Sequence, residues 1–566
     1  MTAGADERRL WTLVLGGGLA LFLVQPPADV WWAAWIAPLP WLLLVTADPL
    51  PGRRPWRALW IGGFLHWLAT IHWLRLPHPA TSIGWVLLAA YLAAYVPAFI
   101  WLARQLVHRW RWPLVPAAAV AWMACEQLRG WVLGGFTFGG LGHTQWRWTT
   151  LIQTADIAGA VGVSGLVIAG AAAIVAALPT ASGWQPRRAM ANLALAGGLL
   201  GATLGYGAWR LATAPAPRGA PLALLLVQGS IDTELKHDPD AATDVARHYD
   251  DLTVAGLAAW PAGGRPDVIV WPETMWRWGL VEIDPTEILE EQVVERLVGP
   301  EPSGADAALR AERQARCRRI LEQERLDALA VFARRYGAPW LVGLDKQAIA
   351  PAATRHYNCG LFLDATGSPL ACYSKLHPVM FGEYIPLADR FPFLYRLTPL
   401  PAGLTAGKDH VAVEIAGHRV AVNICYETAL PDAVRALVNG LETRDGPPDV
   451  LVNLTNDGWF WGSSELDMHL VAAIFRAVEV RIPIAIAANT GFSAAIDGCG
   501  RLLERGPRRA SATLAARLHP DGRRSPWRVT GTLPTGACVA VAVAVMLEAA
   551  LGRRIRDRLH RRPQSG

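Results

Sequence analysis

The chain has 566 residues, of which 52% are hydrophobic and 18% are charged, and its formal net charge is +6. Soluble globular proteins contain about a quarter charged residues, so this composition argues against a wholly soluble protein. The basic residues lie between apolar runs and at the C-terminal end, a pattern that sets membrane orientation. We therefore expect no nucleic-acid partner.

Apolar stretches of the length that crosses a bilayer, about 20 residues, fill the N-terminal part of the chain and recur once near its end. Their ranges are 10–26, 30–47, 56–75, 82–103, 113–130, 157–178, 190–211 and 533–551. The fifth is the weakest candidate because Glu126 and Arg129 lie at its end. The first lacks a small-residue cleavage site, so we interpret it as a retained span and not as a signal peptide.

Arginine residues are concentrated in some of the loops that join these ranges and nearly absent from others. They occur before the first range, between the second and third, and after the fourth, the sixth and the last, whereas the loops around 26–29 and 76–81 carry almost none. The positive-inside rule then predicts that both termini are cytoplasmic and that the segment between the last two ranges is extracytoplasmic. The predicted domains are a transmembrane bundle of about seven helices at 1–213, a catalytic domain at 214–530, a C-terminal transmembrane helix at 531–552 and a basic cytoplasmic tail at 553–566.

After an Ala/Pro-rich linker at 214–221, strand-like runs alternate with helical patterns. The predicted strands are 222–227, 268–271, 339–344, 358–363, 370–373, 411–415, 420–424, 450–454 and 484–488, and the predicted helices are 241–259, 307–336, 431–438 and 467–481. Continuous apolar runs are typical of strands buried on both faces, which favours a layered α/β domain. The charged segment at about 282–319 is interpreted as a solvated helical insertion.

Three of the predicted strands are followed by reactive side chains. Glu273 follows Val-Ile-Val-Trp-Pro, Lys375 follows Leu-Ala-Cys-Tyr-Ser, and Cys425 follows Val-Ala-Val-Asn-Ile. A thiol is a useful nucleophile when a cation favours its thiolate, and a carboxylate can take up its proton. The spacing alone leaves open whether the three meet, because a lone Cys, Glu or Lys at such a place is more often a packed or solvated residue.

At these residues the chain resembles the nitrilase, or carbon–nitrogen hydrolase, superfamily and, through its membrane part, the apolipoprotein N-acyltransferase family. The resemblance covers nearly the whole chain. Its motifs are Val227-Gln-Gly-Ser-Ile231, Trp271-Pro-Glu273, Phe381-Gly-Glu-Tyr-Ile-Pro386, Cys425-Tyr-Glu427, Asn453-Leu-Thr-Asn-Asp-Gly-Trp-Phe460, Arg476-Ala-Val-Glu479, Ala488-Asn-Thr-Gly-Phe-Ser493 and Glu126-Gln-Leu-Arg-Gly-Trp131. It implies a multi-span helical bundle joined to an extracytoplasmic α/β nitrilase-like αββα sandwich.

The resemblance also implies the roles of individual residues. Glu273 would be the general base, Lys375 would stabilise the thiolate and the oxyanion, and Cys425 would be the nucleophile. Supporting roles would fall to Glu383, which orients Lys375 and a bound amine, and to Tyr426 and Glu427. The alternative is that each of these supporting residues only makes an ordinary hydrogen bond at a strand edge.

The implied reaction joins two lipid substrates in turn. Cys425 would take an acyl group from the sn-1 ester of a membrane phospholipid and pass it, through a thioester, to the N-terminal α-amine of the diacylglyceryl-cysteine of an apolipoprotein. A double displacement of this kind needs no metal and no dissociable cofactor. The resemblance places the protein, as a monomer, in the bilayer of the bacterial cytoplasmic (inner) membrane with its catalytic domain on the periplasmic side.

The chain departs from the family pattern at several positions. His237 stands where the family usually has Trp, Met380 where it has Pro, and Met468 where it has Gln. The membrane motif reads Gly135-Phe-Thr-Phe138 instead of Gly-Phe-Pro-Trp, and the 282–319 insertion looks longer than usual. These departures affect the expected shape of the lipid pocket. Two apolar loops, 387–404 and 458–462, either face lipid or only cap the domain core.

Two other functions fit part of the pattern. A membrane-tethered amidase would use the same three residues with water as the acceptor, although a hydrolase of soluble amides would need only a tether. A transporter or scaffold with a relic domain is the second alternative. Its spans would normally carry ionisable groups near the bilayer midplane, and these ranges offer few beyond His66 and His72.

Overall fold

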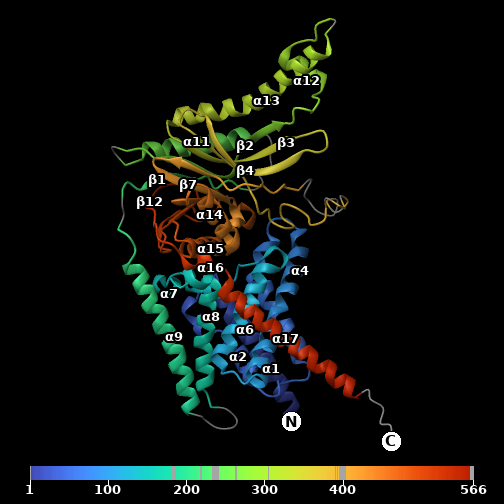
Figure 1. Cartoon of the computed structure of the whole chain (residues 1–566), viewed down its shortest axis with the longest axis vertical. Helices are drawn as coiled ribbons and strands as arrows, with labels where there is room; N and C mark the ends of the chain where they lie inside the picture. Colours follow the sequence, from blue (N-terminus) through green and yellow to red (C-terminus); the bar gives the residue numbers. More distant parts are fainter. Residues whose placement is uncertain are drawn as a thin grey trace.

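The computed structural model describes residues 2–179, 186–216, 219–232, 241–261, 264–303, 305–388, 390, 391, 393, 395 and 403–560. The protein has two parts, a helical bundle and a layered α/β domain that sits on one end of it (Figure 1). The first helix begins, and the last helix ends, at the opposite end of the bundle (Figure 1). His237 lies outside the described residues, as does the 396–402 part of the 387–404 loop.

Every predicted apolar range contains helix. The bundle elements are α1 (Thr2–Leu23), η1 (Trp31–Trp35), α2 (Leu39–Thr46), α3 (Pro55–Thr70), η2 (His72–Arg75), α4 (Thr81–Ala93), α5 (Tyr95–Arg104), η3 (Gln105–Arg109), α6 (Leu114–Trp131), η4 (Val132–Gly134), η5 (Gly142–Gln145), α7 (Thr149–Ile152), α8 (Ala155–Ala177), α9 (Pro186–Ala212) and α17 (Leu533–His560). Among the described residues, 4 helical stretches are long and apolar enough to cross a membrane, namely Thr81–Arg109, Ala155–Ala177, Ala189–Ala212 and Leu533–Gly552. Helix α17 continues into the predicted tail, and residues 561–566 lie outside the described part.

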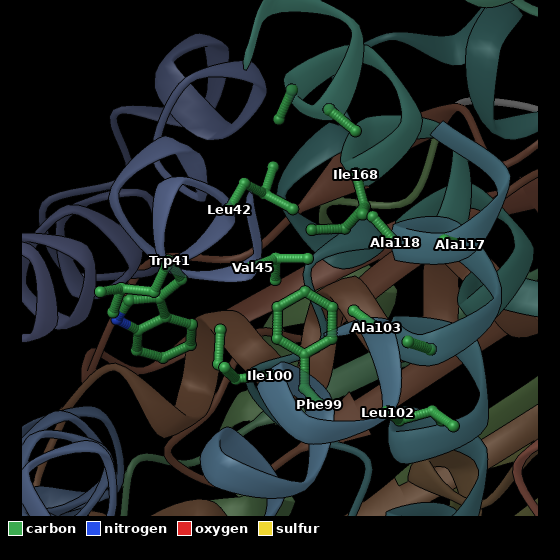
Figure 2. Packing of buried hydrophobic residues seen from close by; sticks show 14 of the residues in the cluster. Trp41, Leu42, Val45, Phe99, Ile100, Leu102, Ala103, Ala117, Ala118 and Ile168 are labelled. Atoms are coloured by element: carbon green, nitrogen blue, oxygen red, sulfur yellow. The ribbon is translucent and has the colours of Figure 1, made fainter. Parts of the chain in front are cut away.

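The bundle is held together by an apolar core in which large and small side chains alternate. Figure 2 shows Trp41 and Leu42 from α2, Phe99 from α5 and the small residues Ala117 and Ala118 of α6, all of which belong to one buried apolar cluster. Small residues let helix backbones approach closely, and this close approach is the main source of attraction between helices in lipid. The two alanines are fully buried, so substitution by a larger residue would separate the helices.

Helix α8 is interrupted inside the bundle. Gly159 has φ 66°, a left-handed value that breaks the run of helical hydrogen bonds. The backbone N–H of Ala160 donates instead to Glu479 Oε1 at 2.9 Å, and Glu479 belongs to the α/β domain. Arg476 lies against the same carboxylate, with Nε at 2.6 Å from Oε2. The break in α8 is therefore closed by a side chain of the other part of the protein.

The α/β domain contains two six-stranded sheets, with strand orders β12-β1-β2-β3-β4-β5 and β11-β10-β9-β8-β7-β6. Their strands are β1 (Leu222–Gln228), β2 (Val268–Ile283), β3 (Trp340–Ile349), β4 (Arg355–Leu363), β5 (Pro369–Ser374), β6 (Ala412–Ile415), β7 (His418–Ile424), β8 (Val450–Thr455), β9 (Ile484–Ala488), β10 (Ala494–Ile496), β11 (Leu502–Arg505) and β12 (Ala512–Leu518). The helices are α11 (Ala242–Ala258), α12 (Glu291–Val298), α13 (Ala307–Tyr336), α14 (Pro431–Asp445), α15 (Glu465–Val480) and α16 (Pro526–Thr530), with the turns η7 (Cys425–Ala429) and η8 (Asp457–Phe460).

The layers follow from alternation along buried strands. In β1, Leu224 and Leu226 point into the core between the two sheets, whereas Leu225 and Val227 pack against the outer helices α11 and α13. Helices α14 and α15 cover the second sheet in the same way. Burial on both faces explains why these strands have continuous apolar sequences, and it gives the αββα sandwich that the resemblance implies.

Three short strands were not predicted from the sequence. β10, β11 and β12 are Ala-rich or charged, with little β propensity. β10 pairs with its sequence neighbours β9 and β11, whereas β12 pairs with β1, far away in sequence. The charged insertion forms α12 and the first part of α13, at the end of the domain farthest from the bundle (Figure 1).

Buried polar and apolar contacts join the domain to the bundle. Asp156 of α8 is fully buried and accepts hydrogen bonds from Arg210 Nε (2.8 Å) on α9 and Arg481 Nη2 (2.5 Å) just after α15. Trp73 of the bundle meets Phe460 of the domain edge-on, with ring centroids 5.0 Å apart. Because a buried charge that loses its partner is strongly destabilising, this junction favours one fixed arrangement of the two parts.

Candidate active site

The three predicted reactive residues converge between the two sheets. Lys375 and Cys425 directly follow the last residues of β5 and β7, as predicted. Glu273 does not follow a strand end, because β2 continues to Ile283. Its pairing with β3 is irregular between Trp271 and Trp276, and this irregularity presents Glu273 to the site.

The irregularity in β2 has a local cause. Pro272 has no N–H to donate to the neighbouring strand, and Thr274 has φ 56°, in the left-handed region. The opposing position on β3 is Gly343, where a Cβ atom would lie 2.1 Å from the carbonyl oxygen of Pro272. Glycine at this position therefore allows the two backbones to approach closely enough to form the bulge.

Lys375 is the buried cation of the site. Its Nζ donates to Glu383 Oε1 at 2.7 Å and lies 3.5 Å from Glu273 Oε1. The lysine side chain is only 1% exposed. Burial lowers the pKa of Lys375, but the carboxylates of Glu383 and Glu273 raise it more, so its pKa lies well above the usual value and the amine is charged.

Glu273 is fixed by donors from both sheets. Asn358 Nδ2 of β4 donates to its Oε1 at 2.6 Å, and the backbone N–H of Asn456 donates to its Oε2 at 2.9 Å. These contacts hold the carboxylate with one oxygen directed at Lys375. A carboxylate oriented in this way can accept a proton without changing its rotamer.

Cys425 begins the turn η7 in a left-handed conformation, with φ 53°. The residue remains partly accessible. Dense packing around the thiol, followed by the charge of Glu273, raises the pKa of Cys425 well above its usual value, and Lys375 opposes this shift. The resting sulfur is therefore protonated, and a base must remove its proton when a substrate is attacked. Glu273 is the carboxylate with the largest electrostatic effect on this thiol.

Glu427, predicted as a supporting residue, links the two strand ends. Its carboxylate accepts from the backbone N–H groups of Leu376 (2.7 Å), His377 (2.9 Å) and Ile424 (2.7 Å), and from the hydroxyl of Tyr373. The first two N–H groups follow Lys375 and the third precedes Cys425. Glu427 thus fixes the distance between the amine and the thiol.

Tyr426 points toward the bundle. Its hydroxyl donates to the carbonyl of Gly135 at 2.8 Å, and its ring lies 5.8 Å from that of Phe138. Thr137 donates from Oγ1 to the carbonyl of Ala429 at 2.7 Å, at the other end of η7. The Gly135-Phe-Thr-Phe138 departure therefore supplies a contact to the nucleophile turn that a proline at 137 could not make.

Two other departures, Met468 and Met380, fall within the described residues. Met468 is 4% exposed and packs in the apolar cluster that joins α15 to the bundle. Met380 pairs with Tyr384 through an isolated bridge next to Glu383.

Four polar residues that hold the site have no role predicted from the sequence, although Asn453 and Asn456 stand in a quoted motif. Asn358 and Asn456 hold Glu273, and Asn453 and His469 contact the carbonyl of Cys425. An available signal was the occurrence of Asn in otherwise apolar strands, at the start of 358–363 and within 450–454. A buried amide requires partners, and here the partners lie on Glu273 and Cys425 or beside them.

Comparison with known proteins assigns both parts of the chain. Residues 17–173 match the family described as the apolipoprotein N-acyltransferase N-terminal domain, and residues 252–525 match the carbon-nitrogen hydrolase family. A protein of Rhodopirellula baltica named apolipoprotein N-acyltransferase is 31% identical over 552 residues, covering 92% of this chain and 93% of the relative. The chain belongs to the apolipoprotein N-acyltransferase family. A relative of the same name from Geobacter metallireducens is 29% identical and covers 96% of this chain and 95% of its own length.

Solved structures also resemble this member of the apolipoprotein N-acyltransferase family in part. An amidase from Nesterenkonia sp. has a TM-score of 0.34 and 16% identity, and the match covers 56% of this chain and 98% of the amidase. Family membership makes the chain an acyltransferase of the carbon–nitrogen hydrolase superfamily, and it disfavours the alternative of a tethered amidase.

Proposed function

We propose that the protein transfers an acyl chain from a membrane phospholipid to the N-terminal α-amine of a diacylglyceryl-cysteine on apolipoproteins, with Cys425 as nucleophile. The observation that carries this proposal is the buried Lys375 amine held by Glu273 and Glu383 next to the Cys425 thiol. The relatives' name supports the class of acceptor, and the apolar helices support a lipid donor.

In the first half-reaction, Glu273 accepts the thiol proton as the sulfur attacks the carbonyl carbon of the phospholipid ester. Lys375 stabilises the negative charge that develops on the carbonyl oxygen. The ester C–O bond then breaks, the leaving oxygen takes the proton from Glu273, and a lysophospholipid departs. The acyl group stays on Cys425 as a thioester.

In the second half-reaction, the α-amine of the acceptor attacks the thioester carbon and gives a proton to Glu273. The C–S bond breaks, the proton returns to sulfur, and an amide leaves the site. Because the same residues serve both halves in turn, we expect ping-pong kinetics. Neither half consumes an oxidant, a metal or a dissociable cofactor.

We further propose that residues 1–213 and 531–552 lie in the bacterial cytoplasmic membrane and that the domain at 214–530 lies on its periplasmic side. The termini, including the 553–566 tail, would be cytoplasmic and the protein a monomer. The distribution of arginines supports this orientation. The outward-facing residues Ile83 (68% exposed) and Leu87 (65% exposed) on α4 are suited to contact with lipid.

Apolar side chains near the site fit lipid substrates. Phe381 and Leu387 are 66% and 69% exposed, and they flank Glu383 in the sequence. Trp461, 46% exposed, follows η8 in the 458–462 loop. Large exposed apolar residues of this kind are typical of a membrane interface, where they would meet acyl chains next to Lys375 and Cys425.

Mass spectrometry of the purified protein in detergent micelles with phospholipid tests the proposal. We expect an acyl adduct on Cys425 that hydroxylamine removes. Cys425→Ala should lack both adduct and turnover. Cys372→Ser, which changes another partly accessible cysteine of the same domain, should keep both.

A second incubation distinguishes acyl transfer from hydrolysis. Adding a diacylglyceryl-cysteine peptide to the acylated protein should convert the adduct into an N-acylated peptide. Release of free fatty acid at a rate independent of the peptide would support the amidase alternative. Full turnover by the Cys425→Ala protein would exclude the proposed chemistry.

A further inference from the structure

The carbonyl oxygen of Cys425 accepts hydrogen bonds from two side chains. Asn453 Nδ2 and His469 Nε2 both lie 3.2 Å from it. Left-handed backbone conformations of non-glycine residues are energetically unfavourable and persist only where the surroundings enforce them. This carbonyl belongs to Cys425, whose φ is 53°. The two donors that hold the carbonyl therefore also hold the residue in its left-handed conformation.

His469 is itself fixed on its other side. Its Nδ1 lies 3.1 Å from Oδ1 of Asp457, and that oxygen also accepts from Thr455 Oγ1 at 2.8 Å. His469 and Asp457 are each 3% exposed. A carbonyl oxygen and a carboxylate only accept hydrogen bonds, so a ring that contacts both must carry a proton on each nitrogen.

The charges around His469 are consistent with such an imidazolium. Burial lowers the pKa of His469, but the Asp457 carboxylate raises it more, so the pKa lies above the usual value. Burial and the charge of Asp457 raise the pKa of Glu465 well above its usual value, which leaves this carboxyl neutral. One cation, His469, then faces one anion, Asp457, in a closed environment.

We propose that His469 is a positioning residue of the acyl transfer, which holds the Cys425 backbone in its attacking conformation through the Nε2–H to carbonyl hydrogen bond while Asp457 fixes the ring. The proposal rests on the proposed function, because the conformation it preserves is that of the nucleophile. His469 does not contact the reacting sulfur through either nitrogen; it acts through the main chain of Cys425.

The side chains of Asp457, Glu465 and His469 resemble a cation site, but their contacts do not fit a bound metal ion. Asp457, Glu465 and His469 bring their oxygen and nitrogen atoms within 4.8 Å of one another. A metal ion would need a deprotonated His469 Nδ1, but that nitrogen faces Asp457 as a donor. Glu465 Oε2, which has no hydrogen-bond partner among the described residues, belongs to a neutral carboxyl and does not require a cation.

The test compares His469→Phe, which removes the donor, with His469→Gln, whose amide can still donate to the carbonyl. The measured quantities are the single-turnover rate of Cys425 acylation and the KM for phospholipid, in micelles. Losing a hydrogen bond from a charged donor lowers a rate roughly 10- to 100-fold, so we expect this loss for His469→Phe with an unchanged KM. His469→Gln should recover most of it.

A matched control is His248→Gln, because Nε2 of His248 also contacts a backbone carbonyl, that of Gly229, at 2.8 Å. This variant should acylate at the wild-type rate. The proposal is overturned if His469→Phe acylates normally, if His469→Gln is no better than His469→Phe, or if EDTA removes a stoichiometric metal and the activity with it. Absence of any adduct on wild-type Cys425 would count against the acyl transfer itself and not against the role of His469.

Discussion

The nucleophile turn η7 is held differently on its two sides. On the side of the sheets, Glu427 accepts hydrogen bonds from backbone N–H groups next to Lys375 and Cys425. On the side of the bundle, single neutral hydrogen bonds reach Tyr426 and Ala429 from the 135–138 segment. The first set has a charged acceptor, whereas the second is neutral.

The two sets of hydrogen bonds therefore have different roles. One set arranges the reacting groups, and the other orients the turn relative to the bundle. Charge-assisted bonds are roughly twice as strong as neutral ones, so the sheets fix the relative positions of thiol and amine. The weaker contacts from the bundle orient the finished turn toward the membrane part. Substitutions on the sheet side should therefore abolish the reaction or unfold the site, and substitutions on the bundle side should only reduce the rate.

The largest effect is expected for Lys375→Met. Losing one group that stabilises the oxyanion costs about 10²- to 10³-fold in rate, and acylation of Cys425 should fall by that factor. The pKa of the thiol should also move. Lys375 lowers it, so Lys375→Met should shift the pH midpoint of Cys425 alkylation by iodoacetamide upward.

Glu273→Gln should shift the pH midpoint of Cys425 alkylation in the opposite direction. Because Glu273 raises the pKa of Cys425, its removal should shift the alkylation midpoint to lower pH even though acyl transfer is lost. Shifts in the same direction for both variants would contradict the arrangement of charges described for the site.

The next effect is expected for Glu427→Gln. The amide cannot accept from all of the N–H groups that the carboxylate serves, and loss of such buried charged hydrogen bonds costs about 3 kcal/mol. Thermal unfolding in micelles should show a clear fall in Tm together with lost activity. Glu504→Gln, at an exposed position on β11, should leave the Tm unchanged.

The smallest effect is expected when the hydrogen bonds between η7 and the bundle are removed. Thr137→Val keeps the side-chain shape and removes the hydrogen bond to Ala429, which is worth about 1 kcal/mol, so the acylation rate should fall about fivefold. Tyr426→Phe should behave similarly. Thr443→Val, which removes an exposed hydroxyl bond on α14, is the control. A loss as large as that of Lys375→Met would mean that the bundle takes a direct part in the chemistry.

Much of the fold could be predicted from sequence because buried strands and lipid-facing helices have strong apolar patterns. The positions of Lys375 and Cys425 after their strands follow from the same pattern. Glu273 was wrongly expected past a strand end, because the prediction ended the strand at Trp271, before Pro272, whereas the chain resumes pairing beyond a bulge. A proline interrupts one hydrogen bond of a strand without always terminating it.

The supporting contacts could not be predicted, because they join residues far apart in the chain. Asn456 holds Glu273 across 183 positions, and His469 reaches Cys425 across 44. The sequence shows that Asn and His occur in apolar surroundings, where buried polar groups require hydrogen-bond partners. The partners themselves are set by strand order, which local pattern does not encode.

The closure of the α8 break has a consequence for biogenesis. Ala160 and Glu479 are separated by 319 positions, so the helix is synthesised long before its missing acceptor. If the domain is translocated as proposed, α8 waits in the bilayer with an unsatisfied N–H until the far segment has crossed and folded back onto it. The Ala160 N–H of α8 thus gains its acceptor only after this far segment of the chain has folded onto the bundle.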